Sequence, residues 1–456
     1  MKNLTLENIA KACGGVYYGP DSARGQEVAE IVTDSRQAKE GSLFVAIRGE
    51  RVDGHSFIPA VYKQGALCVL CEQRPADAQG PYILVDSTLE AVKGIAAFYR
   101  RQLDVKVVGI TGSVGKTSTK EIVASVLSEK YRVLKTLGNF NNELGVPLTI
   151  FRLREDDEVA VIEMGINHFG EMHRLSRIAQ PDICVITNIG QCHLEFLGDR
   201  DGVLRAKSEI FDYLAPDGRI ILNGDDDKLA SISQVKGITP LFFGMEGKRR
   251  IRAQEVRSLG LKGVGCSIYI DEDSFETTIP IPGMHMVYNA MAAAAAGTCL
   301  GMTREEIKRG IEKLEALGGR FKIIEENGIT VIDDCYNANP VSMQASLKVL
   351  NDALQRKVAI LGDMGELGEN EISLHEKVGT YAAGLDLQMC ICIGPLCRYL
   401  AAAARKANPA LETVTFDSVE EALGKLPELI HRGDAVLVKA SHFMHFEKIV
   451  DALTKK

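Results

Sequence analysis

The segment Gly109-Ile-Thr-Gly-Ser-Val-Gly-Lys-Thr117 decides the fold, because a run of β-branched residues leads into it and a stretch with helical spacing follows it. A strand that turns through glycines into a helix is typical of parallel α/β sheets. The glycines allow backbone N–H groups to surround phosphate oxygens, Lys116 offsets their charge, and Thr117 can bind Mg²⁺. The first glycine stands one position before its place in the usual phosphate-loop pattern, so a simple strand–helix connection is the alternative. We predict that this turn binds nucleotide phosphates.

Strands and helices continue to alternate after this turn. The expected strands of this block lie at residues 105–110, 159–163, 183–188 and 219–223, and the expected helices at about 116–129 and 171–178. Alternation of this kind implies right-handed crossovers and a mostly parallel sheet. A β-rich excursion at about 252–279 and an alanine-rich helix after Tyr288 close the block.

Two further blocks flank the central one. Residues 1–86 contain short β-like runs separated by Gly- and Pro-containing turns, which indicate a small α/β unit. After Gly318-Gly319, apolar runs separated by helical segments indicate a doubly wound layer without a GxGxxG opening. The predicted fold class is therefore α/β with three domains: a small N-terminal α/β domain at 1–86, a central phosphate-loop ATPase domain with a parallel sheet at 87–317, and a C-terminal Rossmann-like domain at 318–456.

The composition excludes several classes of protein. With 53 Lys+Arg against 61 Asp+Glu, the formal net charge is −8, which argues against a protein held on nucleic acid by charge. The most apolar stretch, residues 290–302, is too short to cross a bilayer. Glu7 and Lys11 interrupt the place where a signal peptide needs an apolar segment, and 11 scattered cysteines favour free thiols. We therefore expect a cytoplasmic protein with no membrane span and no nucleic-acid partner.

Polar residues near the expected strand ends extend the phosphate site. Glu163 ends a strand and can hold Mg²⁺, although a charged strand terminus is the plain alternative. His193 follows the strand end at Thr187-Asn188, where a metal ligand and a structural histidine are both open. Arg320 comes after two glycines and can reach a γ-phosphate, or it marks a hinge.

Asparagines crowd the segment before Gly145 and Pro147, at Asn139, Asn141 and Asn142. Asparagine favours turns, so an ordinary loop is one interpretation. The other is a set of neutral amide groups that contact phosphate or peptide groups of a substrate without adding charge.

The motifs as a set resemble one protein family, in order and over nearly the whole chain. They are Thr-Gly-Ser-Val-Gly-Lys-Thr at 111–117, Asn-Phe-Asn-Asn-Glu-Leu-Gly-Val-Pro at 139–147, Glu163-Met-Gly, Thr187-Asn188 with His193, Ala206-Lys207-Ser-Glu209, Gly283-Met-His285 with Asn289, Gly319-Arg320 and Asp333-Asp334-Cys-Tyr-Asn-Ala-Asn-Pro340. This set resembles the Mur ligases of peptidoglycan synthesis, which are ATP-dependent amide-bond ligases of three domains.

Two segments narrow the resemblance to one member of the family. Asp334-Cys-Tyr-Asn-Ala-Asn-Pro340 and Gly362-Asp-Met-Gly-Glu-Leu-Gly368 are similar to the family member that adds D-alanyl-D-alanine to the UDP-N-acetylmuramoyl tripeptide. The Asp-Asn-Pro-Arg motif of the enzyme that adds the third amino acid is absent from the sequence.

The resemblance implies a role for each matching position. The implied catalytic residues are Lys116, Lys207, His193 and Arg320. The implied ATP contacts are Gly112, Ser113, Val114, Gly115, Lys116, Thr117, Ser118, Asn289, Arg320 and Asp334. The implied metal ligands are Thr117, Glu163, His193 and Lys207 as a carbamate. The implied contacts to the UDP substrate are Ser35, Arg36, His55, Asn141 and Asn142, and those near the amine acceptor are Tyr336, Asn337 and Asn339.

The implied cofactors are ATP and two Mg²⁺ ions, together with a carbamylated Lys207. We expect a monomeric enzyme. The tripeptide carboxylate attacks the γ-phosphate to give an acyl phosphate and ADP, and the amine of D-alanyl-D-alanine then displaces phosphate. A sister ligase with another amine acceptor, such as a folylpolyglutamate-type synthetase, is one alternative. A phosphate-loop ATPase switch is another, but it leaves Asn139 to Asn142, Lys207 and the segment 334–340 without a role.

Overall fold

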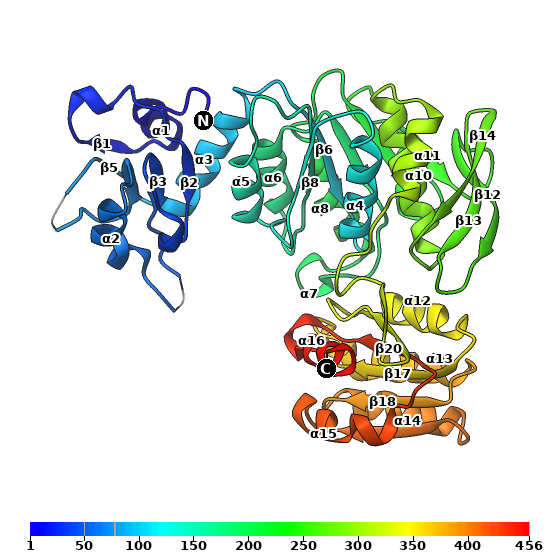
Figure 1. Ribbon diagram of the computed structural model, residues 1–456. Coiled ribbons are helices and arrows are strands. Elements are labelled where there is room, and N and C mark those ends of the chain that lie inside the picture. The colour runs from blue at the N-terminus through cyan, green and yellow to red at the C-terminus, as the bar shows by residue number, and fades with distance from the viewer. Residues whose placement is uncertain (50, 77–78, 456) are drawn as a thin grey trace.

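The computed structural model of the protein describes residues 1–49, 51–76 and 79–455. Three β-sheets follow one another along the chain, with the N-terminal sheet at the left, the central sheet at the top and the C-terminal sheet below (Figure 1). This arrangement confirms the predicted α/β class. The proposed domain boundaries, 86/87 and 317/318, fall between the sheets. No helix among the described residues is long and apolar enough to span a bilayer.

The N-terminal sheet is small and has five strands in the order β1-β5-β4-β3-β2. Its strands pair in parallel, except that β1 runs antiparallel to β5. The elements are α1 (Leu6–Cys13), β1 (Val16–Tyr18), β2 (Glu30–Val32), β3 (Ser42–Val45), α2 (Ile58–Lys63), β4 (Cys68–Cys71), β5 (Tyr82–Leu84) and α3 (Thr88–Arg100). Helix α3 contributes to the same buried cluster as strands of both this sheet and the central one, so it joins the two.

The central sheet has nine strands in the order β14-β13-β12-β11-β10-β9-β6-β8-β7. The strands from β7 to β12 pair in parallel, and β12, β13 and β14 are antiparallel, as the β-rich excursion predicts. The strands are β6 (Lys106–Thr111), β7 (Val133–Lys135), β8 (Val159–Glu163), β9 (Ile183–Ile186), β10 (Arg219–Asn223), β11 (Leu241–Gly244), β12 (Ile251–Ser258), β13 (Val264–Ile270) and β14 (Asp273–Ile279). The helices are α4 (Lys116–Leu127), α5 (Gly145–Ile150), α6 (Glu171–Ala179), α7 (Leu194–Leu197), α8 (Arg200–Ser208), α9 (Asp227–Ala230), α10 (His285–Cys299) and α11 (Arg304–Glu312).

Helices cover both faces of the central sheet because its strands are apolar on both sides. In β6, Val108 and Ile110 join the buried cluster that contains α4 and α10, whereas Val107 joins the one that contains α3, α5 and α6. Alternate residues of a strand point to opposite faces, so a continuous β-branched run requires two covering layers. This packing leaves the carboxyl ends of β6, β8 and β9 at one edge of the sheet, where the polar loops lie.

The C-terminal sheet has six strands in the order β15-β16-β20-β17-β18-β19. All pairs are parallel except the β15–β16 hairpin. The elements are β15 (Lys322–Glu326), β16 (Ile329–Asp333), α12 (Pro340–Asn351), β17 (Arg356–Gly362), α13 (Glu371–Ala383), β18 (Met389–Ile393), α14 (Cys397–Ala407), β19 (Glu412–Phe416), α15 (Val419–Leu429), β20 (Asp434–Lys439) and α16 (Glu447–Thr454). The doubly wound layer is therefore as predicted, with an additional antiparallel edge strand, β15.

Candidate active site at the junction of the domains

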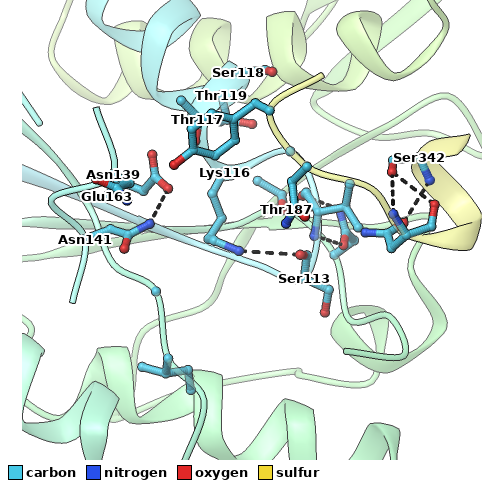
Figure 2. Close-up of a pocket in the computed structure, with 18 of the residues that line it drawn as sticks. Ser113, Lys116, Thr117, Ser118, Thr119, Asn139, Asn141, Glu163, Thr187 and Ser342 are labelled. Carbon is cyan, nitrogen blue, oxygen red and sulfur yellow. Dashed lines mark hydrogen bonds between the residues drawn. The ribbon is translucent and has the colours of Figure 1, made fainter. Parts of the chain in front are cut away.

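A cavity of about 1060 Å³ lies where the central sheet meets loops of the C-terminal body. The cavity is lined by the start of α3, the loops at the carboxyl edge of the central sheet, helix α10, the turn at residues 319–321, the loops after β16 and β17, and Lys439 at the end of β20. Figure 2 shows the phosphate-loop residues beside Asn141, Glu163, Thr187 and, from the C-terminal body, Ser342. The lining residues that the sequence predicts are Ser113, Val114, Gly115, Lys116, Thr117, Ser118, Asn141, Asn142, Glu163, His193, Asn289, Arg320, Asp334, Tyr336, Asn337 and Asn339.

The predicted phosphate loop connects β6 to α4. Helix α4 begins at Lys116, and Gly115 before it has φ +84°, a conformation that glycine adopts without steric cost. Lys116 Nζ donates to the Gly112 carbonyl oxygen at 2.9 Å and to the Ser113 carbonyl oxygen at 3.4 Å, so its ammonium lies over the loop. Figure 2 shows Lys116 beside Ser113. The helix N-terminus and the lysine thus present positive potential to the same part of the cavity.

The loop after β9 holds the phosphate loop in shape. The backbone N–H of Ser113 donates to the Asn188 carbonyl at 3.0 Å, and that of Val114 donates to Asn188 Oδ1 at 3.0 Å. Thr187 Oγ1 in turn donates to the Val114 carbonyl at 2.8 Å. Sequence reasoning noticed Thr187 and Asn188 only as a strand end. Their role as a support for the phosphate loop depends on the β6–β9 pairing.

Replacing Gly112 with alanine is expected to weaken nucleotide binding. A Cβ at this position would lie 1.9 Å from Thr187 Oγ1, so the loop or its support must move. Overpacking costs about 1–3 kcal/mol, and 1.4 kcal/mol corresponds to about a tenfold change in affinity. Calorimetric titration with ATP should show this loss for Gly112→Ala and not for Gly25→Ala, since a Cβ on Gly25 meets nothing within 4 Å. Equal affinities for the two variants would contradict the proposed loop geometry.

Glu163 has the features of a metal ligand. It ends β8 and is 1% exposed, and Asn141 Nδ2 donates to its Oε1 at 2.8 Å (Figure 2). Its other oxygen, Oε2, is buried without a hydrogen-bond partner among the described residues. A buried carboxylate oxygen without a partner is costly, and a bound cation removes that cost. The residues present therefore fit a Mg²⁺ ion beside Thr117 and Glu163, both of which line the cavity.

His193 lies on the cavity wall at the N-terminus of α7. Its backbone has φ +52°, the left-handed region that few residues other than glycine adopt. Burial, together with the charges of Lys207 and Lys116, lowers the pKa of His193 to about 4. The imidazole is therefore neutral near pH 7 and keeps one nitrogen lone pair for a ligand.

Lys207, near the end of α8, is fully buried. It does not line the cavity, and the described residues offer it neither a hydrogen bond nor an ion pair. Burial first, and the charge of Lys116 second, lower the pKa of Lys207 from 10.5 to about 7. A large fraction of this amine is therefore neutral near pH 7, and a neutral amine can add CO₂.

The C-terminal body contributes Arg320 and the segment 334–339. Arg320 stacks over the ring of Tyr336 at 4.2 Å, and its neighbour Gly319 has φ +74° and donates its N–H to Asp333 Oδ2 at 2.7 Å. The side chain thus lies on an aromatic support that faces the cavity. Asn339 caps α12 through Ser342, which places the helix N-terminus at the cavity.

Asp334 is held by a partner that the sequence did not indicate. Lys439 Nζ lies 2.5 Å from Asp334 Oδ2 and also donates to the Asn337 carbonyl at 3.0 Å. Both charged side chains are buried, and Ser346 Oγ donates to the same carboxylate oxygen at 2.7 Å. Lys439 ends β20, the strand next to β16, so only the sheet order brings it to Asp334.

Asn289 of α10 packs against the phosphate-loop helix. Thr119 Oγ1 donates to Asn289 Oδ1 at 3.0 Å, and both side chains are buried at the cavity. This contact joins α4 and α10 on one face of the sheet, where the alanine-rich sequence of α10 allows a close approach.

The predicted UDP-substrate residues of the N-terminal body do not line this cavity. Arg36 pairs with Asp34 at 2.6 Å and is largely exposed. Both ring nitrogens of His55 are engaged, Nδ1 with Asp53 Oδ1 at 2.7 Å and Nε2 with the Glu72 N–H at 2.9 Å. The assignment of Ser35, Arg36 and His55 to the UDP substrate stays a prediction.

The cavity extends toward the N-terminal body along the start of α3. The sequence did not indicate these lining residues. Lys93 is 8% exposed and pairs with Glu143 at 2.8 Å and with Glu90 at 2.7 Å. Arg174 binds the same Glu143 carboxylate. Glu90, Lys93 and Glu143 thus give this end of the cavity charged groups, and Arg174 supports Glu143 from outside the lining.

Fold and site together define a phosphate-loop nucleotide-using enzyme of three α/β parts, with the cavity between the central and C-terminal parts. Residues 27–100 match the catalytic domain of the Mur ligase family, residues 110–297 the Mur ligase middle domain, and residues 319–442 the Mur ligase glutamate ligase domain. The chain belongs to the Mur ligase family.

Relatives and solved structures agree with this assignment over the whole chain. The chain is 36% identical over 459 residues to the UDP-N-acetylmuramoyl-tripeptide–D-alanyl-D-alanine ligase of Bacillus subtilis (strain 168), covering 99% of each chain. It is 33% identical to the protein of the same name from Escherichia coli (strain K12), again covering 99% of each. It is similar to a crystal structure of MurF from Acinetobacter baumannii, with a TM-score of 0.89, 35% identity and 99% coverage of each chain. It is also similar to the MurF ligase from Thermotoga maritima in complex with ADP, with a TM-score of 0.81, 28% identity and coverage of 93% and 96%.

Proposed function

We propose that this chain is a cytoplasmic, ATP-dependent ligase that joins D-alanyl-D-alanine to the UDP-N-acetylmuramoyl tripeptide, giving the pentapeptide precursor of peptidoglycan. The observation that carries the proposal is that the phosphate loop, Arg320, Asp334, Tyr336, Asn337 and Asn339 all line one cavity. Full-length similarity to proteins named for this reaction supports the choice of substrates.

The phosphate loop and Arg320 would act on ATP from opposite sides. Lys116 and the N-terminus of α4 bind the phosphates, and Arg320 stabilises the charge on the γ-phosphate as the tripeptide carboxylate attacks it. The phosphorus–oxygen bond to ADP breaks and an acyl phosphate forms. Asp334 and Asn289 would hold the ribose and adenine.

The second step joins the two substrates. The neutral amine of D-alanyl-D-alanine attacks the acyl carbon, the bond to phosphate breaks, and the leaving phosphate takes up the proton that the amine loses as the amide forms. Tyr336, Asn337 and Asn339 lie on the C-terminal wall of the cavity, where they would orient this amine. Asn141 and Asn142 lie on the central wall, where they would contact the sugar and peptide of the UDP substrate.

Thr117, Glu163, His193 and a carbamylated Lys207 would hold two Mg²⁺ ions. Bound Mg²⁺ offsets the charge of the phosphates and of the approaching carboxylate. Glu163 Oε2, which has no hydrogen-bond partner in the part of the chain that the structure describes, supports the first site. The lowered pKa of Lys207 supports the carbamate, because only a neutral amine reacts with CO₂ and the carbamate then supplies an anionic oxygen.

Exchange of the amine acceptor tests the proposed substrate. Phosphate release in the presence of the UDP tripeptide, ATP and Mg²⁺ should require D-alanyl-D-alanine, and it should be absent with a diamino acid or glutamate. Equal phosphate release with glutamate would favour a folylpolyglutamate-type ligase, and release without any acceptor would favour an ATPase switch.

A further inference from the structure

Glu366 is a carboxylate of the C-terminal body that reaches the central body at His193. Glu366 Oε2 lies 3.6 Å from His193 Nδ1, and both residues line the cavity. This distance is longer than a hydrogen bond, but the Glu366 side chain is 77% exposed, so a small rotation about its side-chain bonds can close the gap. The two residues are far apart in sequence and lie on loops that follow strands of different sheets, β9 and β17.

The loop that carries Glu366 is shaped by hydrogen bonds at successive residues. The Met364 N–H donates to His375 Nε2 at 3.0 Å, and the Gly365 N–H donates to Ser441 Oγ at 2.9 Å. Ser441 N–H donates to the Asp363 carbonyl at 3.1 Å. The backbone just before Glu366 is thus fixed in place.

Further contacts complete this support. The Asp363 carboxylate accepts the Cys397 N–H at 2.7 Å, and Nδ1 of the fully buried His375 bonds with the Glu371 carbonyl at 2.7 Å. Asp363, His375 and Cys397 are close enough together to resemble a metal site, but both ring nitrogens of His375 are engaged with backbone groups. The cluster therefore stabilises the loop that carries Glu366 rather than binding a metal.

Glu366 itself adopts φ +60°, an uncommon conformation for a residue with a side chain. The hydrogen-bonded loop therefore holds this residue in the left-handed region and directs its carboxylate at another domain. This geometry indicates that the carboxylate has a function there. An exposed glutamate on the same turn, Glu369, has none of these features: the described residues give it no hydrogen bond or ion pair, and it does not line the cavity.

We propose that Glu366 positions His193 for the metal: it accepts the N–H of Nδ1 and so leaves the Nε2 lone pair directed at the metal ion. Metal-bound histidines commonly donate their second ring N–H to a carboxylate, which fixes the tautomer and the ring orientation. Because Glu366 belongs to the C-terminal body, this metal site is complete only when that body is in place. The proposal rests on the metal role of His193 in the proposed function.

The test uses Mn²⁺ as the probe, bound to the full-length protein with a non-hydrolysable ATP analogue. Electron spin-echo spectroscopy detects the nitrogen of a histidine bound to Mn²⁺, and the signal should disappear in His193→Ala. In Glu366→Ala the signal should weaken and Mn²⁺ affinity should fall by about tenfold or more, the effect typical of losing such a carboxylate. Glu366→Gln keeps an acceptor oxygen and should lose less, and Glu369→Ala should match the unchanged protein.

An unchanged nitrogen signal and Mn²⁺ affinity in both Glu366→Ala and Glu366→Gln would overturn the proposal. A signal that survives in His193→Ala would do so as well, because the bound nitrogen would then come from another residue. The experiment contains no tripeptide and no amine acceptor. A failure of D-alanyl-D-alanine ligation would therefore leave its result intact, and the two proposals can fail separately.

Discussion

Lys116→Ala is expected to abolish ligation while leaving the fold intact. The Lys116 ammonium lies over the phosphate loop, 2.9 Å from the Gly112 carbonyl, and it would carry the charge that offsets the outer phosphates of ATP. Removal of one preorganised group that stabilises transition-state charge costs on the order of 10²–10³ in kcat. Acyl-phosphate formation should fall at least that far, measured as ADP release in single-turnover experiments.

The matched control is Lys262→Ala, which removes an exposed lysine on a turn away from the cavity. Its turnover should be that of the unchanged protein, and circular dichroism should show the same secondary structure for all three proteins. A Lys116→Ala protein that turns over within a few-fold of the control would remove the phosphate-loop assignment.

Lys207→Ala is expected to cause a loss of similar size for a different reason. Lys207 is buried near His193 and Lys116, and as an ammonium it would repel a metal ion in the cavity. As a carbamate it would supply the oxygen ligand instead. Loss of the ligand should therefore lower ligation by about 10²-fold or more, at the upper end of the effects of losing a metal-supporting group.

Short carboxylic acids separate the carbamate role from a merely structural one. Acetate or formate can supply an oxygen ligand in the space left by Lys207→Ala and should restore part of its activity, but neither should restore Lys116→Ala. Lys207→Met fills the space with an apolar chain and should fold normally without being rescued. Near-normal ligation by Lys207→Ala without added acid would contradict the carbamate.

The carbamate also predicts a pH dependence. Because the folded pKa of Lys207 is lowered to about 7, the amine becomes protonated as the pH falls through 7, and an ammonium cannot hold CO₂. The ¹³C signal of the carbamate, measured in bicarbonate buffer labelled with ¹³C, should therefore be strong at pH 8 and should decline below pH 7.

The parts of the fold that local pattern specifies were predictable. The β-branched run before Gly109 specifies a strand buried on two faces, and the glycine turn with Lys116 specifies the strand–helix connection. The structure places β8 and β10 at the predicted residues. Short strands such as β7 and β11 were missed, because three or four residues carry little periodic signal and gain their stability from neighbouring strands.

Residues of the candidate site could be predicted where a local motif indicates both their chemistry and their position. Glu163 ends β8, and Lys116 and Thr117 begin the helix that follows the neighbouring strand β6, so residue type and position predict that they lie at one edge of a parallel sheet. Lys439 and Lys93 were missed, and Glu366 was noticed only as part of the segment 362–368, without a role. Each of the three reaches the cavity through sheet order or domain contact, which no local pattern records.

The assignment of Ser35, Arg36 and His55 to the UDP substrate stays a prediction. In the structure Arg36 and His55 bond with other residues of the N-terminal body, and none of the three lines the cavity at the phosphate loop.

The most direct test of the central claim is one incubation followed by mass analysis. The full-length protein is mixed with the UDP-N-acetylmuramoyl tripeptide, ATP, Mg²⁺ and D-alanyl-D-alanine. The account predicts one new UDP-linked product, heavier than the tripeptide by one D-alanyl-D-alanine less one water, formed together with equal amounts of ADP and phosphate. Unchanged tripeptide beside ADP and phosphate, or a product that forms equally well with another amine acceptor, would contradict it.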